Sequence, residues 1–204
     1  MDFGRLASGK NVANVIISLE KRGIKPEFLE NSKKAMERIK EIIPSGASVM
    51  AGSSTTLEQI GFIEFLKSKE HLWKNLKGEI LAEADAQKQS DLRRQAVLAD
   101  YFLGSIQAVS LDGEILVASG TGSQLPAYAF TAKNVIWVAG TQKIVKDLET
   151  GFRRLWKYCL PLEDTRMKSI GASGSSVGKI LLFERERNPN RKIYLIFVDE
   201  KLGF

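Results

Sequence analysis

Three short segments rich in glycine and hydroxyl side chains could bind a negatively charged ligand. The first, Gly52-Ser53-Ser54-Thr55-Thr56, lies between a predicted strand and a predicted helix. Gly52 permits a tight turn, and free backbone N–H groups at a helix start attract anions. The hydroxyls add donors for the oxygens of a phosphate, carboxylate or sulfate. A hydroxyl here can also act only as the helix N-cap, so both interpretations stay open.

The second segment, Ser119-Gly120-Thr121-Gly122-Ser123-Gln124, and the third, Gly140-Thr141-Gln142-Lys143, each follow an apolar run. Lys143 could complement an anion or be a solvated surface lysine. Ligands of open α/β sheets bind at the carboxyl ends of strands, so we expect the three segments to face one pocket. The candidate ligand-binding residues are Gly52, Ser53, Ser54, Thr55, Thr56, Gly120, Thr121, Gly122, Ser123, Gln142 and Lys143.

Other chemistry-bearing patterns are weaker. The first segment lacks the Gly-Lys-Ser/Thr of a Walker loop and the spacing of a dinucleotide fingerprint. One cysteine (Cys159) and one histidine (His71) exclude an internal disulfide and an all-histidine metal site, so no metal site is predicted. The identity of any cofactor is left unassigned.

The titratable residues near the expected pocket do not form a catalytic set. We favour structural roles in the first helical turn, in turns and at an N-cap for Glu58, Asp100, Asp112 and Asp147. Cys159 is expected to be a buried packing thiol, because no histidine accompanies it as a base. The catalytic residues are therefore left unassigned.

Apolar periodicity predicts the elements that position these segments. Helices are expected at residues 12–19, at 32–43 with Asn31 or Ser32 as cap, at 57–66, at 91–99 and at 147–158, the last closed by Pro161. Strands are expected at residues 25–29, 49–51, 101–104, 135–139, 179–183 and 192–198, and as a hairpin of 108–110 and 115–118 around Asp112-Gly113. Pro26 makes the first strand an edge strand. Helices alternating with short apolar strands predict an α/β fold, a three-layer sandwich with a mostly parallel central sheet.

Size and composition suit a globular protein. The chain has 204 residues, of which 44% are hydrophobic and 26% charged. We expect one domain over residues 1–204, with a helical N-terminal segment of about residues 1–24 packed on it. No apolar run approaches the length of a membrane span and no signal peptide is evident, so a cytoplasmic location without membrane contact is expected.

The net charge of +6 is concentrated in residues 151–192, with ten basic and four acidic side chains. A nucleic-acid surface is the sharper interpretation, but no aromatic residues interleave as a stacking platform. We therefore favour a solvated face and no nucleic-acid partner, the residues concerned being Arg153, Arg154, Lys157, Arg185, Arg187, Arg191 and Lys192.

From residue 45 onward the sequence resembles the LUD-domain family, named for lactate utilisation. The resemblance is carried, in the family's order, by residues 52–61, 99–108, 112–114, 120–123, 133–140, 142–145 and the ending Glu200-Lys201-Leu202-Gly203-Phe204. It implies a fold similar to sugar-phosphate isomerases, glucosamine-phosphate deaminases and CoA transferases, in which a turn like residues 52–56 holds the anionic end of a ligand. It also implies a setting in lactate oxidation beside an iron–sulfur subunit.

The chain departs from these families at three places. Residues 167–178 lack the cysteine cluster of many short LUD proteins, Gln142 replaces a common asparagine, and residues 104–107 hold no carboxylate where the isomerases place an acid–base aspartate. Isomerisation by that route is therefore not expected.

We expect an accessory LUD-domain protein of lactate or organic-acid utilisation that binds a small anionic metabolite or cofactor. The alternatives are a CoA-transferase- or isomerase-like enzyme acting on a phosphorylated or CoA-linked substrate, and an interaction subunit whose glycine turns only close the fold. A homodimer is possible, but no interface is evident.

Overall fold

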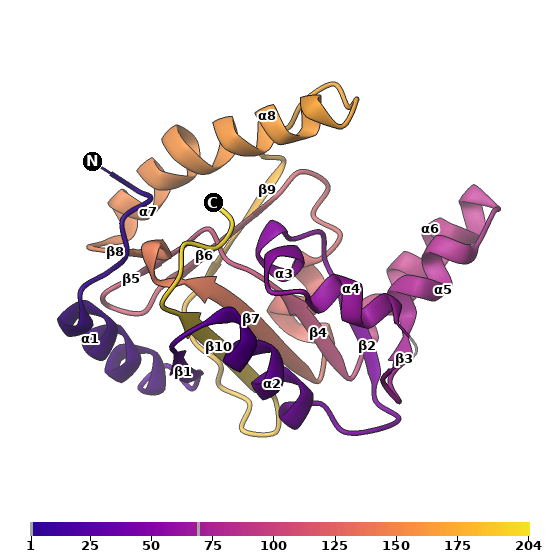
Figure 1. Ribbon diagram of the computed structural model, residues 1–204, viewed down its shortest axis with the longest axis horizontal. Coiled ribbons are helices and arrows are strands. Elements are labelled where there is room, and N and C mark those ends of the chain that lie inside the picture. The colour runs from indigo at the N-terminus through magenta and orange to yellow at the C-terminus, as the bar shows by residue number, and fades with distance from the viewer. Residues whose placement is uncertain (1, 69) are drawn as a thin grey trace.

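A central sheet of six parallel strands organises the chain. The computed structural model describes residues 2–68 and 70–204 (Figure 1). The sheet order is β1-β10-β7-β4-β2-β3. The strands are β1 (Lys25–Leu29), β2 (Ser48–Ala51), β3 (Lys74–Asn75), β4 (Tyr101–Gly104), β7 (Asn134–Gly140) and β10 (Lys192–Val198). The prediction that residues 25–29 form an edge strand is confirmed, since β1 stands at the end of the sheet order and, in the described part of the chain, pairs with β10 alone.

Strand β7 shows why the middle of this sheet is almost wholly apolar. Val135 and Trp137 belong to the hydrophobic cluster on one face of the sheet, and Ile136 and Val138 belong to the cluster on the other. Side chains alternate between the faces of a strand, so a strand covered on both faces must be apolar throughout. The interpretation of residues 135–139 as such a strand is confirmed.

Helices α2 (Ser32–Ile42), α3 (Thr55–Gln59) and α4 (Phe62–Lys67) cover one face of the central sheet. The α2 helix begins at Asn31, whose side chain accepts a hydrogen bond from the Lys34 N–H, as the capping pattern predicts. Helix α1 (Gly9–Glu20) buries Val15 and Leu19 in the cluster on the opposite face.

A second sheet, of order β8-β5-β6-β9, packs on that opposite face. It comprises β5 (Ala108–Ser110), β6 (Ile115–Ser119), β8 (Ile144–Val145) and β9 (Lys179–Phe183). The predicted hairpin is confirmed by antiparallel pairing of β5 with β6. Helices α7 (Leu148–Arg154) and α8 (Leu160–Ser169) lie on its side of the molecule (Figure 1). The predicted α/β three-layer sandwich is confirmed, and its third layer contains this small sheet.

The remaining helices complete the layers. Helices α5 (Leu76–Ala82) and α6 (Ala86–Gln95) extend beyond β3 at the right of Figure 1. Four short turns carry the labels η1 (Ala96–Leu98), η2 (Ala127–Thr131), η3 (Thr141–Lys143) and η4 (Leu155–Cys159), with η4 linking α7 to α8. The helix predicted at residues 91–99 is thus the end of α6 followed by the single turn η1.

Two predicted helix boundaries are wrong. The helix expected over residues 57–66 is divided into α3 and α4, because Gly61 adopts a φ of +77° that ends regular α-helix. The helix expected to stop at Pro161 instead continues to Ser169. Pro161 lies in the first turn of α8, where its missing N–H costs little, and the wider turn η4 precedes it.

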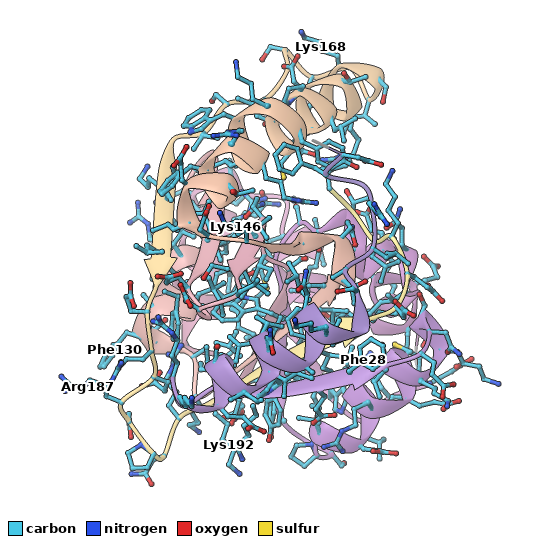
Figure 2. The ribbon with its side chains drawn as sticks, turned by 90° about the vertical axis from the view of Figure 1, so that its left-hand side faces the viewer. Phe28, Phe130, Lys146, Lys168, Arg187 and Lys192 are labelled. Atoms are coloured by element: carbon cyan, nitrogen blue, oxygen red, sulfur yellow. The ribbon has the colours of Figure 1, made fainter. Side chains whose placement is uncertain are left out.

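Basic residues of the C-terminal third occur at both ends of the molecule. Figure 2 shows Lys168 on α8 at one end of the molecule and Lys192, at the start of β10, at the other. The expectation that all of them are solvated is wrong for Arg154 and Arg191, which are buried. The Arg191 guanidinium donates to the backbone oxygens of Ala127, Tyr128 and Ala132, so a buried arginine here ties η2 to the sheet.

Within the described ranges 2–68 and 70–204, no helix is both long enough and apolar enough to span a bilayer. The same residues contain no group of three or more His, Cys, Asp or Glu side chains placed to hold a metal ion.

Candidate functional site

A cavity of about 700 Å³ opens at the carboxyl ends of β2, β4 and β7. Because these strands are parallel neighbours, the segments that follow them meet at one edge of the sheet. The wall is formed by Met50 and Ala51 at the end of β2, residues 52–56 after it, residues 105–107 after β4 and Lys143 after β7. The small sheet and α8 contribute residues 118–121, 123–124, 174–177 and the side chains of Glu163 and Arg166. The three predicted segments therefore converge on one cavity.

The segment at residues 52–56 both caps a helix and lines the cavity. Ser54 is the N-cap of α3, and its Oγ accepts a hydrogen bond of 3.3 Å from the Leu57 N–H. All five residues contribute to the wall. The capping interpretation is confirmed for Ser54. Because capping occupies one hydroxyl, Ser53 and Thr55 remain at the wall, and ligand contact stays a prediction.

Lys143 is the most unusual side chain at the site. It is 2% exposed although it forms part of the cavity wall. Its Nζ donates to Ser105 Oγ at 2.9 Å and to Thr56 Oγ1 at 3.1 Å, and it has no carboxylate partner among the described residues. Burial, and secondarily the positive charge of Arg154, lower the pKa of Lys143 to about 7. The structure therefore decides against a solvated surface lysine.

The two hydroxyls that contact Lys143 are themselves donors. Ser105 Oγ donates to the Val138 carbonyl at 2.7 Å, and Thr56 Oγ1 donates to the Leu202 carbonyl at 3.4 Å. Because each hydroxyl has one proton, each must accept from the Lys143 amine. The direction of both hydrogen bonds at Nζ is thereby determined by the backbone around them.

Arg154 places a second positive charge behind the wall. The residue is fully buried, and its Nη1 donates to the Gln107 carbonyl and, at 2.9 Å, to Cys159 Sγ. Its Nε and Nη2 atoms find no acceptor among the described residues. Burial lowers the pKa of Arg154, as expected for a charge taken out of water without a carboxylate. A negative charge in the cavity would offset part of this cost.

The charged side chains of the wall are also mostly basic. Lys77, Arg93, Lys143 and Arg166 face only two acidic side chains, Glu58 and Glu163. Arg166 and Glu163 form a two-point ion pair, with N–O distances of 2.7 and 2.8 Å. Burial lowers the pKa of Lys77, whose Nζ lies 3.4 Å from the Ala51 carbonyl. The wall suits a small anion whose oxygens accept from hydroxyls and amines.

Two of the candidate residues lie outside the wall. Gly122 supports its turn with a φ of +82°, while Gly120, Thr121 and Ser123 line the cavity. Gln142 is buried, and its Nε2 donates to the Leu202 carbonyl at 2.8 Å. Gln142 therefore secures the segment around Leu202, which also accepts from Thr56.

The family model of the LUD domain matches residues 12–198, which is most of the chain. The protein is a member of the LUD-domain family. Its structure is similar to that of a DUF162 family protein from Deinococcus radiodurans, with a TM-score of 0.58, 10% identity, and coverage of 95% of this chain and 99% of that one. At this identity the likeness shows the fold.

Two further comparisons add little. The eIF2B beta structure from Chaetomium thermophilum matches 56% of this chain and 43% of that chain at 16% identity, and its TM-score of 0.35 supports no argument. No curated protein matches the chain.

Of the four carboxylates considered in the sequence analysis, one lies in the cavity wall of this LUD domain and three lie elsewhere. Glu58 lies in the wall, on the first turn of α3. Asp100 precedes β4, at the opposite end of that strand from the cavity, and accepts from the Ser48 N–H and Oγ. Asp147 is the N-cap of α7, as predicted. Asp112 is at the β5–β6 turn, where its carbonyl accepts from Arg22. Cys159 is a buried thiol, as expected, and one side of it lines the cavity.

Sequence reasoning missed three contributors to the LUD-domain site: Ser105, Tyr128 and Arg154. Ser105 follows β4 directly, so the strand-end argument used for the other segments could have found it. The Tyr128 ring packs against Phe102 and Trp137, and its hydroxyl lies where a side chain at Gly104 would be. Arg154 carries no sequence signal, because it stands beside the exposed Arg153 in a basic stretch.

Proposed function

We propose that this LUD-domain protein binds a small anionic metabolite in the cavity at the carboxyl ends of β2, β4 and β7. Its role in this proposal is in lactate or organic-acid utilisation. The observation that carries the proposal is the burial of Lys143 at the cavity wall without a carboxylate partner. Buried cations are ordinarily paired, and a bound anion would supply the missing partner.

Three further features support an anion of metabolite size. The wall carries more basic than acidic side chains, Arg154 adds a buried charge behind it, and residues 53–55 supply hydroxyl donors. The volume of about 700 Å³ falls in the usual range of small-molecule sites, about 300–1,000 Å³. A role beside an iron–sulfur subunit agrees with the family resemblance and belongs to the same proposal.

The test is ligand-induced thermal stabilisation with lactate, pyruvate, inorganic phosphate and CoA. A ligand at a hundred times its dissociation constant stabilises the folded state by about 2.7 kcal/mol, which raises the melting temperature measurably. We expect Lys143→Met to abolish this ligand-induced shift. Lys146→Met is the matched control, because Lys146 is three positions away and its side chain is 83% exposed.

The outcomes separate the functions. A shift that depends on Lys143 and not on Lys146 supports the proposal, and absence of a shift with every anion contradicts it. Stabilisation by CoA or phosphate but by neither carboxylate would favour the alternative, an enzyme acting on a CoA-linked or phosphorylated substrate.

A further inference from the structure

The hydrogen bonds around Lys143 leave its nitrogen with a free lone pair. A neutral amine has two N–H donors and one lone pair, and both donors are directed to the hydroxyls of Ser105 and Thr56. An ammonium ion would carry a third N–H, for which no acceptor lies within hydrogen-bond distance among the described residues. These contacts satisfy the neutral amine and leave its lone pair free, while the ammonium form keeps one N–H for an oxygen of an anion in the cavity.

We propose that Lys143 is a nucleophile that forms an imine with a small carbonyl compound carrying a carboxylate or a phosphate. The proposal rests on the anion binding proposed above and adds a covalent step to it. The anionic group would be attracted by the basic wall, and the carbonyl carbon would meet the Lys143 amine at the end of β7. Holding both partners together makes amine addition effectively unimolecular.

The step balances without any further reactant. The Nζ lone pair forms a bond to the carbonyl carbon, and a proton passes from nitrogen to the former carbonyl oxygen, which gives a carbinolamine. Loss of the hydroxyl group and one proton as water leaves a carbon–nitrogen double bond. Release reverses the sequence by addition of water.

The same contacts argue against Ser105 as the nucleophile. A serine activated by lysine must donate its proton to the amine. The Ser105 proton is instead directed to the Val138 carbonyl at 2.7 Å, and its oxygen accepts from Lys143. The geometry thus favours the amine over the hydroxyl.

The protonation state agrees with this chemistry. With a pKa of about 7, about half of the Lys143 side chains are neutral at neutral pH, against on the order of one in a few thousand for an ordinary lysine. The ionisable groups that act on it are Arg154 on α7 and Cys159 in η4, while Ser105 and Thr56 are uncharged. A desolvated lysine near another cation is a recognised way to activate an amine.

The experiment is reductive trapping on the folded, full-length chain. Pyruvate as the carboxylate probe, dihydroxyacetone phosphate as the phosphate probe and hydroxyacetone as the neutral probe are each incubated with the protein and sodium cyanoborohydride. Hydride reduces the imine to a secondary amine. With pyruvate the gain in mass is one pyruvic acid less one oxygen atom, and peptide fragmentation locates it. Because the labelled lysine is identified in the wild-type protein, the result does not depend on whether a variant folds.

We expect Lys143 to be labelled at least ten times faster than any other lysine by one anionic probe, and slower labelling by hydroxyacetone. The faster of the two anionic probes identifies the charged group. Urea-unfolded protein should lose the preference, and Lys143→Arg should lose the adduct while Lys146→Arg keeps it.

Labelling spread evenly over lysines, or none at Lys143, overturns the imine. If pyruvate or phosphate still stabilises the protein in that case, anion binding stands and only the covalent step fails. If neither stabilises it, both proposals fail. Equal labelling of Lys143 by the neutral probe overturns the anionic substrate class.

Discussion

Lys143 Nζ and Ser105 Oγ are 2.9 Å apart, although 38 residues separate them in the sequence. Ser105 follows β4 and Lys143 follows β7, and these two strands are parallel neighbours in the central sheet. Parallel pairing brings the carboxyl ends of both strands to the same edge, so the contact is a consequence of topology. The same edge receives Thr56 from the segment after β2, which completes the surroundings of the amine.

The buried amine of Lys143 should make stability depend on pH. Its pKa falls from an ordinary 10.5 to about 7 on folding, so between these values the unfolded chain binds more protons than the folded one. The free energy of unfolding should therefore rise with pH across this window, by up to about 1.4 kcal/mol per pH unit. Urea unfolding at several pH values should show this slope in the wild type and lose it in Lys143→Met. An unchanged slope in the variant would contradict the assignment.

The positive charge of Arg154 should lower the pKa of Lys143, whereas the charge of its neighbour Arg153 should not. Arg154 is fully buried, whereas Arg153 is exposed and paired with Glu149. In Arg154→Met, loss of the buried charge should move the pKa of Lys143 upward toward its ordinary value. NMR titration of the lysine ε-methylene signals measures this directly. Arg153→Met should leave the titration unchanged, and equal effects of the two variants would disprove the electrostatic coupling.

Gly104 should not tolerate a side chain. A Cβ at this position would lie 1.8 Å from the Tyr128 hydroxyl oxygen, which cannot swing away because Tyr128 is buried between Phe102 and Trp137. We expect Gly104→Ala to lower the free energy of unfolding by about 1–3 kcal/mol. Tyr128→Phe removes the clashing oxygen, so the cost of Gly104→Ala should be smaller in that background. A double-mutant cycle by urea unfolding measures the difference, and strict additivity would refute the clash.

Asp100 should support the fold above acidic pH. Hydrogen bonds from Lys133 and Ser48 lower the pKa of Asp100 from 3.8 to about 2. The carboxylate therefore contributes stability that is complete above about pH 4 and disappears as the pH falls through about 2. Asp100→Asn should reduce stability at neutral pH and flatten the loss between these values. Asp112→Asn is the control, since within residues 2–68 and 70–204 the Asp112 side chain has no hydrogen bond or ion pair and only its carbonyl accepts, from Arg22. A wild-type acid profile in Asp100→Asn would contradict this role.

Much of the framework could be predicted from local patterns. The apolar runs at residues 101–104 and 135–139, the Asp112-Gly113 turn and the Asn31 cap each act within a few residues, so the sequence encodes them directly. The predicted helix boundaries at Gly61 and Pro161 are wrong for two reasons. A glycine can adopt either a helical or a left-handed conformation, and a proline in the first turn of a helix does not end that helix. In both cases packing chooses between local conformations of similar energy.

The sequence alone determined the family, the α/β class and the hydroxyl-rich segments at the strand ends, since these depend on residue type and short-range order. Only the tertiary structure decided that Lys143 and Arg154 are buried, that Ser105 and Thr56 accept from the Lys143 amine, and that Gln142 turns away from the cavity. The reason is physical: the surroundings of a charged group are formed by atoms from distant parts of the chain. No local pattern of residues therefore indicates how far these atoms exclude water from the group.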